Sequence, residues 1–313
     1  MKVLVAGATG VVGSALLPML LKRGHHVAGL VRSDASAAAV KALGATALQA
    51  DAFNAAQVRA ALTAFRPEVA VHQMTALAGL SDLRKFDAAF ALTNRLRTEG
   101  CRIMVDAAAA VGTRRFVSQG YCGWPYARVG GPVKAETDPL DPDPPAQFRR
   151  TFEALQQMER IVTTAPGLEG VVLRYGSFYG PGTNFARDGS FVADVRRRRV
   201  PLIGDAGGVF SFIHVGDVAS ATVAAIEGRP TNIFNVTDDE PAAVDVWLPY
   251  FASVVGARRP IRLPAWLMRL VLPEHLFVMM TSVRGGSNAK FKQRFGWSPA
   301  RASWRDGFRE FAA

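Results

Sequence analysis

The clearest chemical signal in the sequence is a glycine-rich turn near its start. An apolar run of strand length, Lys2–Ala6, is followed by the motif GATGVVG at positions 7–13. Gly7 permits a tight turn, Gly10 lets the backbone approach a pyrophosphate, and Gly13 allows close packing of a helix on the strand. The motif therefore predicts a phosphate-binding loop.

The segment that follows the motif is apolar with helical periodicity from Val11 to Arg23. An anion would rest on the free N–H groups of Val11 and Val12, at the positive end of this helix. The alternative is a glycine-rich turn that holds no ligand. Because the turn joins the first strand to the first helix, we expect dinucleotide binding.

The end of the second apolar run indicates which dinucleotide is bound. Domains specific for NAD carry an acid there for the ribose hydroxyls, but this chain has Val31-Arg32-Ser33. Arg32 and Ser33 can donate to a 2′-phosphate, so the expected cofactor is NADP(H). Asp51, after the third run, could accept from the adenine amino group. The alternatives are a solvated cation at Arg32 and a helix N-terminal acid at Asp51.

The elements that must position these residues alternate between strand and helix. Strict alternation predicts an α/β fold with a doubly wound parallel sheet. We expect residues 1–175 to form the NADP-binding Rossmann domain and 176–313 a smaller substrate-binding lobe, with some interleaving. The expected strands are Lys2–Ala6, His26–Val31, Thr46–Leu48, Val69–His72, Phe116–Ser118 and Gly170–Arg174, and the expected helices Val11–Arg23, Ala35–Leu43, Ala55–Phe65, Leu83–Val111, Gln147–Ala165 and Phe191–Arg198.

Composition limits the partners and the compartment. The 313 residues carry a net charge of +11, and 30 of the 37 cations are arginines spread along the chain, so we expect a diffuse basic surface and no nucleic-acid partner. The one dense cluster is Arg196–Arg199, a solvated helix end. Two cysteines without metal-ligand spacing fit a reducing cytoplasm and no metal, and no segment is apolar enough to span a membrane.

Several motifs in this order resemble the NAD-dependent epimerase/dehydratase family of extended short-chain dehydrogenases. They are GATGVVG, VHQMTAL after the fourth strand, Asn94-x-x-x-Thr98, LRYGSFYGPGT, FSFIHVGDVASA, FNVTDDEP and FGWSPARASWRDGF near the C-terminus. The resemblance covers the whole chain. It implies that the pyrophosphate lies on Gly7, Thr9, Gly10, Val11 and Val12, the adenosine half at Arg32 and Asp51, the ribose side at Met74 and Thr75, and the nicotinamide end at Tyr175, Gly176 and Phe178. We also expect Gly13, Ser33, Ala52 and Ser118 to belong to the cofactor site.

The chain departs from the family at its catalytic pair. The family uses Tyr-x-x-x-Lys on the helix after the fifth strand, but the alignment places Thr151 and Leu155 there, and neither can transfer that proton. Tyr121, just beyond the fifth strand, is the first candidate for a replacement donor; the alternative is an aromatic ring packed on Trp124. The other catalytic candidates are Ser118, Tyr179 and His214, although His214 could instead donate to backbone.

The apolar and aromatic content of the later segments predicts an aromatic or polyketide-like substrate. Its expected contacts are Tyr121, Trp124, Tyr179, Phe212 and Trp266. The first hypothesis is an NADP(H)-dependent oxidoreductase that acts on a small apolar molecule with a non-standard proton donor. The alternatives are a non-redox isomerase, dehydratase or cyclase, and an NADP(H)-binding sensor. The resemblance also implies a possible homodimer through the helices at Leu83–Val111 and Gln147–Ala165.

Overall fold

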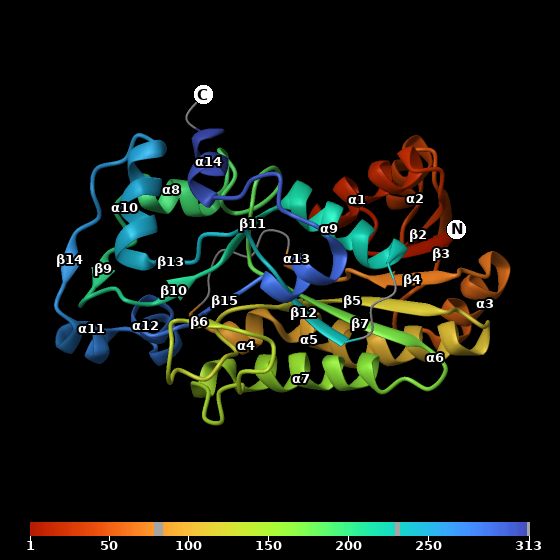
Figure 1. Cartoon of the computed structure of the whole chain (residues 1–313), viewed down its shortest axis with the longest axis horizontal. Coiled ribbons are helices and arrows are strands. Elements are labelled where there is room, and N and C mark those ends of the chain that lie inside the picture. The colour runs from red at the N-terminus through yellow and green to blue at the C-terminus, as the bar shows by residue number, and fades with distance from the viewer. Residues whose placement is uncertain (78–83, 229–231, 312–313) are drawn as a thin grey trace.

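A computed structural model describes residues 1–77, 84–228 and 232–311, and it confirms the expected α/β fold. Its centre is a seven-stranded parallel sheet in the order β12-β7-β5-β4-β1-β2-β3 (Figure 1). From β1 the chain first adds β2 and β3 on one side and then β4, β5, β7 and β12 on the other, so the strand order changes direction at β1. Open α/β sheets bind ligands in the crevice at the carboxyl end of the strands at such a switch point. The strands are β1 (Lys2–Ala6), β2 (His26–Val31), β3 (Thr46–Gln49), β4 (Val69–His72), β5 (Arg115–Tyr121), β7 (Glu169–Tyr175) and β12 (Asn232–Val236).

Helices cover both faces of the sheet because its strands present apolar side chains on each face. Figure 1 shows α1, α2 and α9 above the sheet and α6 and α7 below it. Val5 and Val71 belong to the first core, and Leu4 and Ala70 to the second, as the alternation of a strand requires. The helices are α1 (Val11–Lys22), α2 (Asp34–Ala42), α3 (Ala55–Phe65), α6 (Cys101–Ala110), α7 (Arg149–Thr163) and α9 (Val215–Glu227).

The single helix expected from Leu83 to Val111 is wrong, because the described part of this stretch is divided. It consists of α4 (Phe86–Ala89), α5 (Ala91–Arg95), a π-helical turn (Leu96–Gly100) and α6. His72 of β4 is buried beside the turn, with Nε2 3.1 Å from the Leu96 carbonyl. Burial lowers the pKa of His72 to about 4, so the neutral ring donates to this carbonyl. The buried imidazole thus supports the irregular turn.

The smaller lobe lies at the carboxyl edge of the sheet and has an aromatic core that includes Phe212, Trp247, Phe251 and Phe308. Its short strands pair as β8–β11, β9–β14, β10–β13 and β6–β15. The remaining elements are β6 (Val133–Lys134), β8 (Ser177–Tyr179), α8 (Ser190–Arg196), β9 (Leu202–Ile203), β10 (Val209–Phe210), β11 (Phe212–His214), β13 (Ala242–Ala243), α10 (Val244–Val254), β14 (Arg262–Leu263), α11 (Ala265–Val271), α12 (Glu274–Thr281), β15 (Gly285–Gly286), α13 (Ala289–Phe295) and α14 (Trp304–Arg309).

The two lobes interleave along the chain. Strand β12 comes after the smaller lobe has begun, yet it pairs with β7 at the edge of the main sheet. Helix α9 likewise packs against α1. Among the described residues, no helix combines the length and the apolar character that a membrane span requires.

Candidate functional site

The glycine-rich loop is held by close backbone packing. Gly7 has φ +87°, and a Cβ there would lie 2.6 Å from the Gln73 carbonyl oxygen. A Cβ on Gly13 would lie 2.2 Å from the Gly7 carbonyl oxygen. Neither position can accept a side chain without moving backbone, so these two glycines fix the shape of the loop.

Gly10 differs from the other two glycines because little surrounds it. A Cβ there would have one neighbour within 4 Å, the Gly7 carbonyl oxygen at 3.3 Å. Gly10 begins α1 without a side-chain cap, so the first N–H groups of the helix have no intrahelical partner. The bare backbone next to unpaired N–H donors fits a pyrophosphate.

The loop after β8 lies over the same helix end. Gly182 has φ +78°, and a Cβ there would be 3.4 Å from Val11 Cγ2. The sequence patterns did not single out Gly182 for this contact. Its closeness to Val11 means that the segment Gly180–Thr183 borders the presumed phosphate position from the side of the smaller lobe.

The three polar residues expected at the adenosine end, Arg32, Ser33 and Asp51, lie on the surface. Arg32 is exposed, and within the described residues its guanidinium has no hydrogen bond or ion pair. The Ser33 hydroxyl caps α2 by accepting from the Ser36 N–H at 3.3 Å. Asp51 accepts from the Phe53 N–H at 3.0 Å, so one carboxylate oxygen is used locally, while Asn54 is the N-cap of α3. Arg32 is therefore the group best placed to hold a phosphate.

The residues expected near the ribose and nicotinamide lie at the carboxyl ends of β4, β5 and β7. Met74 is half-buried and Thr75 exposed, and Ala52 is half-buried. Ser118 is fully buried inside β5, and its Oγ has no hydrogen-bond partner in the described chain.

Tyr175 is fully buried at the carboxyl end of β7. Its phenol is 3.1 Å from Gln73 Nε2 and 2.7 Å from Thr222 Oγ1. Gly176 is packed so closely that a Cβ would be 2.6 Å from the Ser211 carbonyl oxygen. Phe178 is half-buried, and its ring centroid is 5.7 Å from that of Tyr175. These residues therefore form close packing just beyond the carboxyl end of β7.

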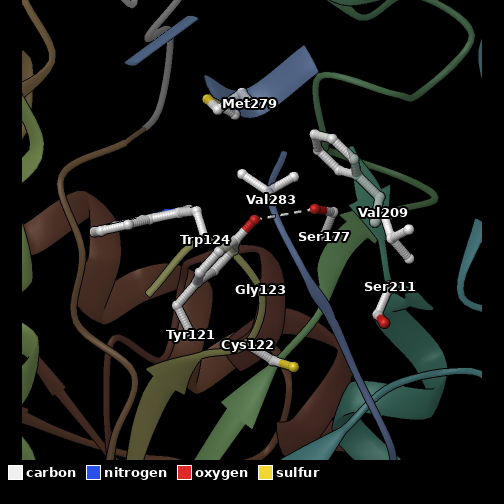
Figure 2. Close-up of a pocket in the computed structure, with 10 residues that line it drawn as sticks. Tyr121, Cys122, Gly123, Trp124, Ser177, Val209, Ser211, Met279 and Val283 are labelled. Atoms are coloured by element: carbon white, nitrogen blue, oxygen red, sulfur yellow. Dashed lines mark hydrogen bonds between the residues drawn. The ribbon is translucent and has the colours of Figure 1, made fainter. Parts of the chain in front are cut away.

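A small, mostly apolar pocket lies beside these strand ends (Figure 2). Its empty volume is about 230 Å³, including the open mouth. Of the residues expected to contact substrate, Tyr121 and Trp124 line this pocket, whereas its walls at Ser177, Met279 and Val283 were not expected from the sequence. The lining residues are Tyr121, Cys122, Gly123, Trp124, Ser177, Val209, Phe210, Ser211, Met279 and Val283.

Tyr121 and Ser177 supply a pair of hydroxyl groups to the pocket. Figure 2 shows the Tyr121 phenol directed toward Ser177, with the two oxygens 3.1 Å apart. Burial raises the pKa of Tyr121 to about 12, and the hydrogen bond with Ser177 offsets part of that effect. The phenol is therefore neutral at physiological pH and can donate a hydrogen bond.

Tyr121 also packs against aromatic rings, as the alternative interpretation held. Its ring centroid is 6.1 Å from that of Trp124, which lies 4.4 Å from Phe148. Both interpretations of Tyr121 hold together, because its ring packs against Trp124 while its hydroxyl is directed toward Ser177.

The two secondary candidates for acid–base chemistry lie elsewhere. Tyr179 is fully buried, with its ring 5.3 Å from Phe308 and 5.4 Å from His214. His214 caps α9: its Nδ1 accepts from the Gly216 N–H at 3.0 Å, so the ring accepts from backbone instead of donating to it. Burial lowers the pKa of His214. Neither residue lines the pocket that contains Tyr121.

Two further expected substrate contacts, Phe212 and Trp266, do not line the pocket. Phe212 is fully buried in the core of the smaller lobe, one residue beyond the pocket wall. Trp266 is 71% exposed on α11 and does not line the pocket.

Helix α7 has a structural contact where the family has its catalytic tyrosine. The fully buried Thr151 hydroxyl donates to Asp87 Oδ1 at 2.6 Å and accepts from Asn94 Nδ2 at 3.0 Å. Asp87 also accepts from the N–H groups of Arg150 and Thr151, so its carboxylate caps α7 from α4. Leu155 is buried in the apolar core below the sheet. The two aligned positions therefore hold the fold together, and neither Thr151 nor Leu155 supplies an acid or a base.

A buried ion pair anchors the same helix to the sheet. Glu159 of α7 binds Arg174 of β7 with two hydrogen bonds of 2.6 and 2.7 Å. Arg174 also donates to the Tyr126 hydroxyl at 3.0 Å. A second pocket, whose empty volume of about 210 Å³ includes open solvent, is lined by Tyr121, Pro125, Leu140, Phe152, Leu155, Gln156, Glu159 and Arg174. Tyr121 therefore borders both pockets.

Replacing Thr151 with valine should destabilise the protein by about 1–3 kcal/mol, because Asp87 loses a donor and Asn94 an acceptor. We expect turnover per folded molecule to change less than about threefold, far below the effect of removing an acid–base group. Chemical denaturation and steady-state kinetics measure the two effects separately. Thr163→Val is the matched control, because that exposed hydroxyl bonds only within its own helix. A stable but inactive Thr151→Val protein would contradict the assignment.

Comparison with known proteins gives a family and several relatives. The model of the "NAD dependent epimerase/dehydratase family" matches residues 3–237. A Streptomyces protein named "3-diazoavenalumate denitrifying reductase" is 45% identical over 308 residues, which are 98% of this chain and 99% of that protein. A Stigmatella aurantiaca "4-hydroxy-2-methyl-3-oxo-4-farnesyl-3,4-dihydroquinoline-1-oxide ketoreductase" is 26% identical, covering 83% of this chain and 75% of that protein.

Solved structures share the fold. A Thermotoga maritima UDP-glucose 4-epimerase with UDP-glucose has a TM-score of 0.77 at 19% identity, covering 100% of this chain and 97% of that one. A human epimerase family protein with NADPH has a TM-score of 0.73 at 21% identity, covering 100% of this chain and 99% of that one. At these identities the likeness concerns the arrangement of the chain alone.

Proposed function

The chain belongs to the NAD-dependent epimerase/dehydratase family, and we propose that it is an NADP(H)-dependent reductase that removes the diazo group from an aromatic molecule. The names of its relatives support an oxidoreductase, and the relative that is 45% identical over nearly the whole of both chains is named for denitrifying reduction of a diazo compound. The diazo substrate class is taken from that name. The observation in this chain that favours a diazo substrate is that α7 carries Thr151 and Leu155 in place of the Tyr-x-x-x-Lys pair.

The Thr151 hydroxyl on α7 is engaged by Asp87 and Asn94, and Leu155 is apolar. Reduction of a ketone needs a proton on the substrate oxygen, because an alkoxide is a poor product at neutral pH. Loss of a diazo group has no such requirement. The aromatic carbon gains a hydride while its two nitrogens leave as N₂, so the bond that breaks needs no proton. An enzyme for this reaction can do without the Tyr–Lys relay.

A bound NADPH would supply the hydride, leaving NADP⁺. The residues present fit both phosphate-bearing parts of this cofactor, the pyrophosphate and the 2′-phosphate. The bare backbone at Gly10 and the unpaired N–H groups at the start of α1 would hold the pyrophosphate. The free guanidinium of Arg32 would hold the 2′-phosphate.

Tyr121 and Ser177 would bind an oxygen substituent on the ring of the substrate. As the diazo carbon accepts a hydride, negative charge develops on a conjugated oxygen and yields a phenolate. The neutral Tyr121 phenol, in a mostly apolar pocket, can donate a hydrogen bond to that oxygen. Trp124 and Phe210 provide aromatic walls for a flat ring. We therefore propose an aromatic diazo substrate that also carries a ring oxygen.

Deuterium tracing tests this function. The protein is incubated with an ortho-hydroxyarenediazonium salt and NADPH deuterated at the transferring position of C4, and the products are analysed by mass spectrometry. We expect one deuterium on the ring carbon that lost nitrogen and one NADPH consumed per N₂ released. Loss of nitrogen without transfer of deuterium, or no loss above the enzyme-free rate, would reject the proposal. Binding of NADPH without turnover would favour the sensor hypothesis.

Ketone reduction is the second candidate, because the Tyr121–Ser177 hydroxyl pair could also polarise a carbonyl and one relative is named a ketoreductase. The same protein is therefore assayed with aromatic ketones, quinones and enones. Consumption of NADPH with these compounds, but not with the diazo compound, would favour this candidate.

The cofactor preference should depend on Arg32. We expect NADPH to bind at least about tenfold more tightly than NADH, and Arg32→Ala to erase most of that difference by removing a charge-assisted contact of about 1–3 kcal/mol. Titration of both cofactors by fluorescence measures the two affinities. Arg59→Ala, which removes an exposed arginine of α3, should leave them unchanged. Equal affinities for NADPH and NADH in the parent protein would remove the case for NADP(H).

A further inference from the structure

Helix α11 presents an apolar surface to solvent that the proposed reaction does not use. None of its residues is buried. Trp266 is 71% exposed, Leu270 80% and Val271 69%, and Leu267 lies beside them. Positions 266, 267, 270 and 271 fall within one side of a helix. We call these four residues the α11 face.

The α11 face is directed outward by the way the helix sits on the smaller lobe. Ala265 packs over the turn at Gly204, where an added Cβ would be 2.9 Å from the Ala265 Cβ. Met268 and Leu272 are half-buried. Residues 265, 268 and 272 lie on the side of the helix opposite the α11 face. Figure 1 places α11 with β9 and β14 at the end of the molecule away from the N-terminus.

Several exposed arginines lie at the same end of the molecule as the α11 face, at the end of α8, on the segment between α10 and β14, on β14 and on α11 itself (Figure 1). The dense cluster Arg196–Arg199 is joined to the segment between α10 and β14, since Arg196 donates to the Val255 carbonyl at 3.0 Å and Arg198 to the Arg259 carbonyl at 3.3 Å. Among the described residues, only Arg199 of this group forms an ion pair with an acid, Asp194. The exposed arginines of these segments are Arg196, Arg197, Arg198, Arg199, Arg258, Arg259, Arg262 and Arg269.

We propose that the α11 face and these arginines bind the surface of an anionic lipid bilayer. An exposed helix with tryptophan, leucine and valine on one side, at an end of the molecule that also carries exposed arginines, matches an interfacial helix, whose apolar side enters the boundary between headgroups and acyl chains. These arginines, of which only Arg199 pairs with an acid among the described residues, provide the complementary charge for lipid phosphates. A protein partner would instead need a groove that encloses this convex face.

This contact would lie on the surface of the membrane, so it requires no spanning helix. It also has a consequence for the pocket, because α12 follows α11 and carries Met279, which lines the pocket. Docking through α11 would bring the lobe that borders the pocket next to the bilayer, where small apolar aromatic molecules concentrate.

Vesicle binding tests the proposal with the full-length protein. Sedimentation with phosphatidylcholine vesicles is compared with vesicles containing one-third phosphatidylglycerol, at low and high salt. We expect binding to the anionic vesicles alone, weakened by salt. Trp266 is the most exposed of the five tryptophans, so its fluorescence should shift to the blue and be quenched by brominated lipid.

Two surface variants and their controls separate the apolar and the charged contributions. Leu270→Gln and the double variant Arg258→Gln, Arg259→Gln should each weaken binding at least about fivefold, as expected from about 1 kcal/mol per buried apolar group or per arginine. Leu43→Gln, at the exposed C-cap of α2, and Arg59→Gln, at an exposed position of α3, should bind like the parent. Equal binding to neutral vesicles, or no binding at low salt, would overturn the proposal. A dimer in light scattering that Leu270→Gln dissociates would show that a second copy covers this face and would also overturn it.

Discussion

Replacing Gly10 with valine should reduce the affinity for NADPH more than about 100-fold while the protein stays folded. The large effect is expected because the branched side chain would occupy the space where a pyrophosphate lies against backbone. The fold should survive because the Gly7 carbonyl oxygen, at 3.3 Å, is the one atom within 4 Å of a Cβ at this position. Thermal unfolding and calorimetric titration with NADPH check the two parts.

Two further glycines provide the controls for this variant. Gly131 is exposed, and a Cβ there would have no neighbour within 4 Å, so Gly131→Val should bind NADPH like the parent. Gly13→Ala should instead destabilise the protein, because its Cβ would overlap the Gly7 carbonyl oxygen at 2.2 Å. If Gly10→Val retains NADPH through purification, the phosphate site is elsewhere.

The fold could be predicted from the sequence because its signals are local. Strands β1, β2 and β4 and helix α3 have the bounds expected from apolar periodicity and turn residues. The division of the described part of the Leu83–Val111 stretch could not be predicted in this way, because the π-helical turn is hydrogen-bonded to His72, a residue on another element. Periodicity within one segment carries no information about such a partner.

The candidate site could be predicted only where a motif specifies it. The glycine loop lies where GATGVVG placed it, at the start of α1. The pocket walls at Ser177, Met279 and Val283 come from three separate segments, which tertiary packing alone brings to Tyr121. For Trp266 the sequence was misleading. Its place in an apolar segment suggested a substrate contact, but the side chain lies exposed on α11.

The neighbours of each tyrosine hydroxyl explain why Tyr121 is preferred over Tyr175 and Tyr179 as the hydrogen-bond donor to substrate. The Tyr175 phenol is saturated by Gln73 and Thr222, and Tyr179 is enclosed by rings of the smaller lobe. Tyr121 is half-buried, its hydroxyl meets Ser177, and both residues line a pocket. A group that must donate to a bound substrate needs this combination of burial and access.

Replacing Tyr121 with phenylalanine should lower the turnover of an oxygen-bearing aromatic diazo compound on the order of 100-fold, the usual cost of losing one donor to a developing oxyanion. The ring packing on Trp124 and the affinity for NADPH should be unchanged, because only a hydroxyl is removed. Ser177→Ala should have a smaller effect, since it removes the neighbour of the donor and leaves the phenol in place.

The pH dependence and solvent isotope effect of the parent protein show how Tyr121 acts. With a pKa of about 12, the phenol stays protonated between pH 6 and pH 10, and the donor would be lost only as the pH rises toward that value. We therefore expect turnover in this range to be independent of the ionisation of Tyr121. Because no proton needs to move while N₂ leaves, the rate in D₂O should be close to that in H₂O. A large solvent isotope effect that disappears in Tyr121→Phe would instead assign Tyr121 to proton transfer and favour ketone reduction.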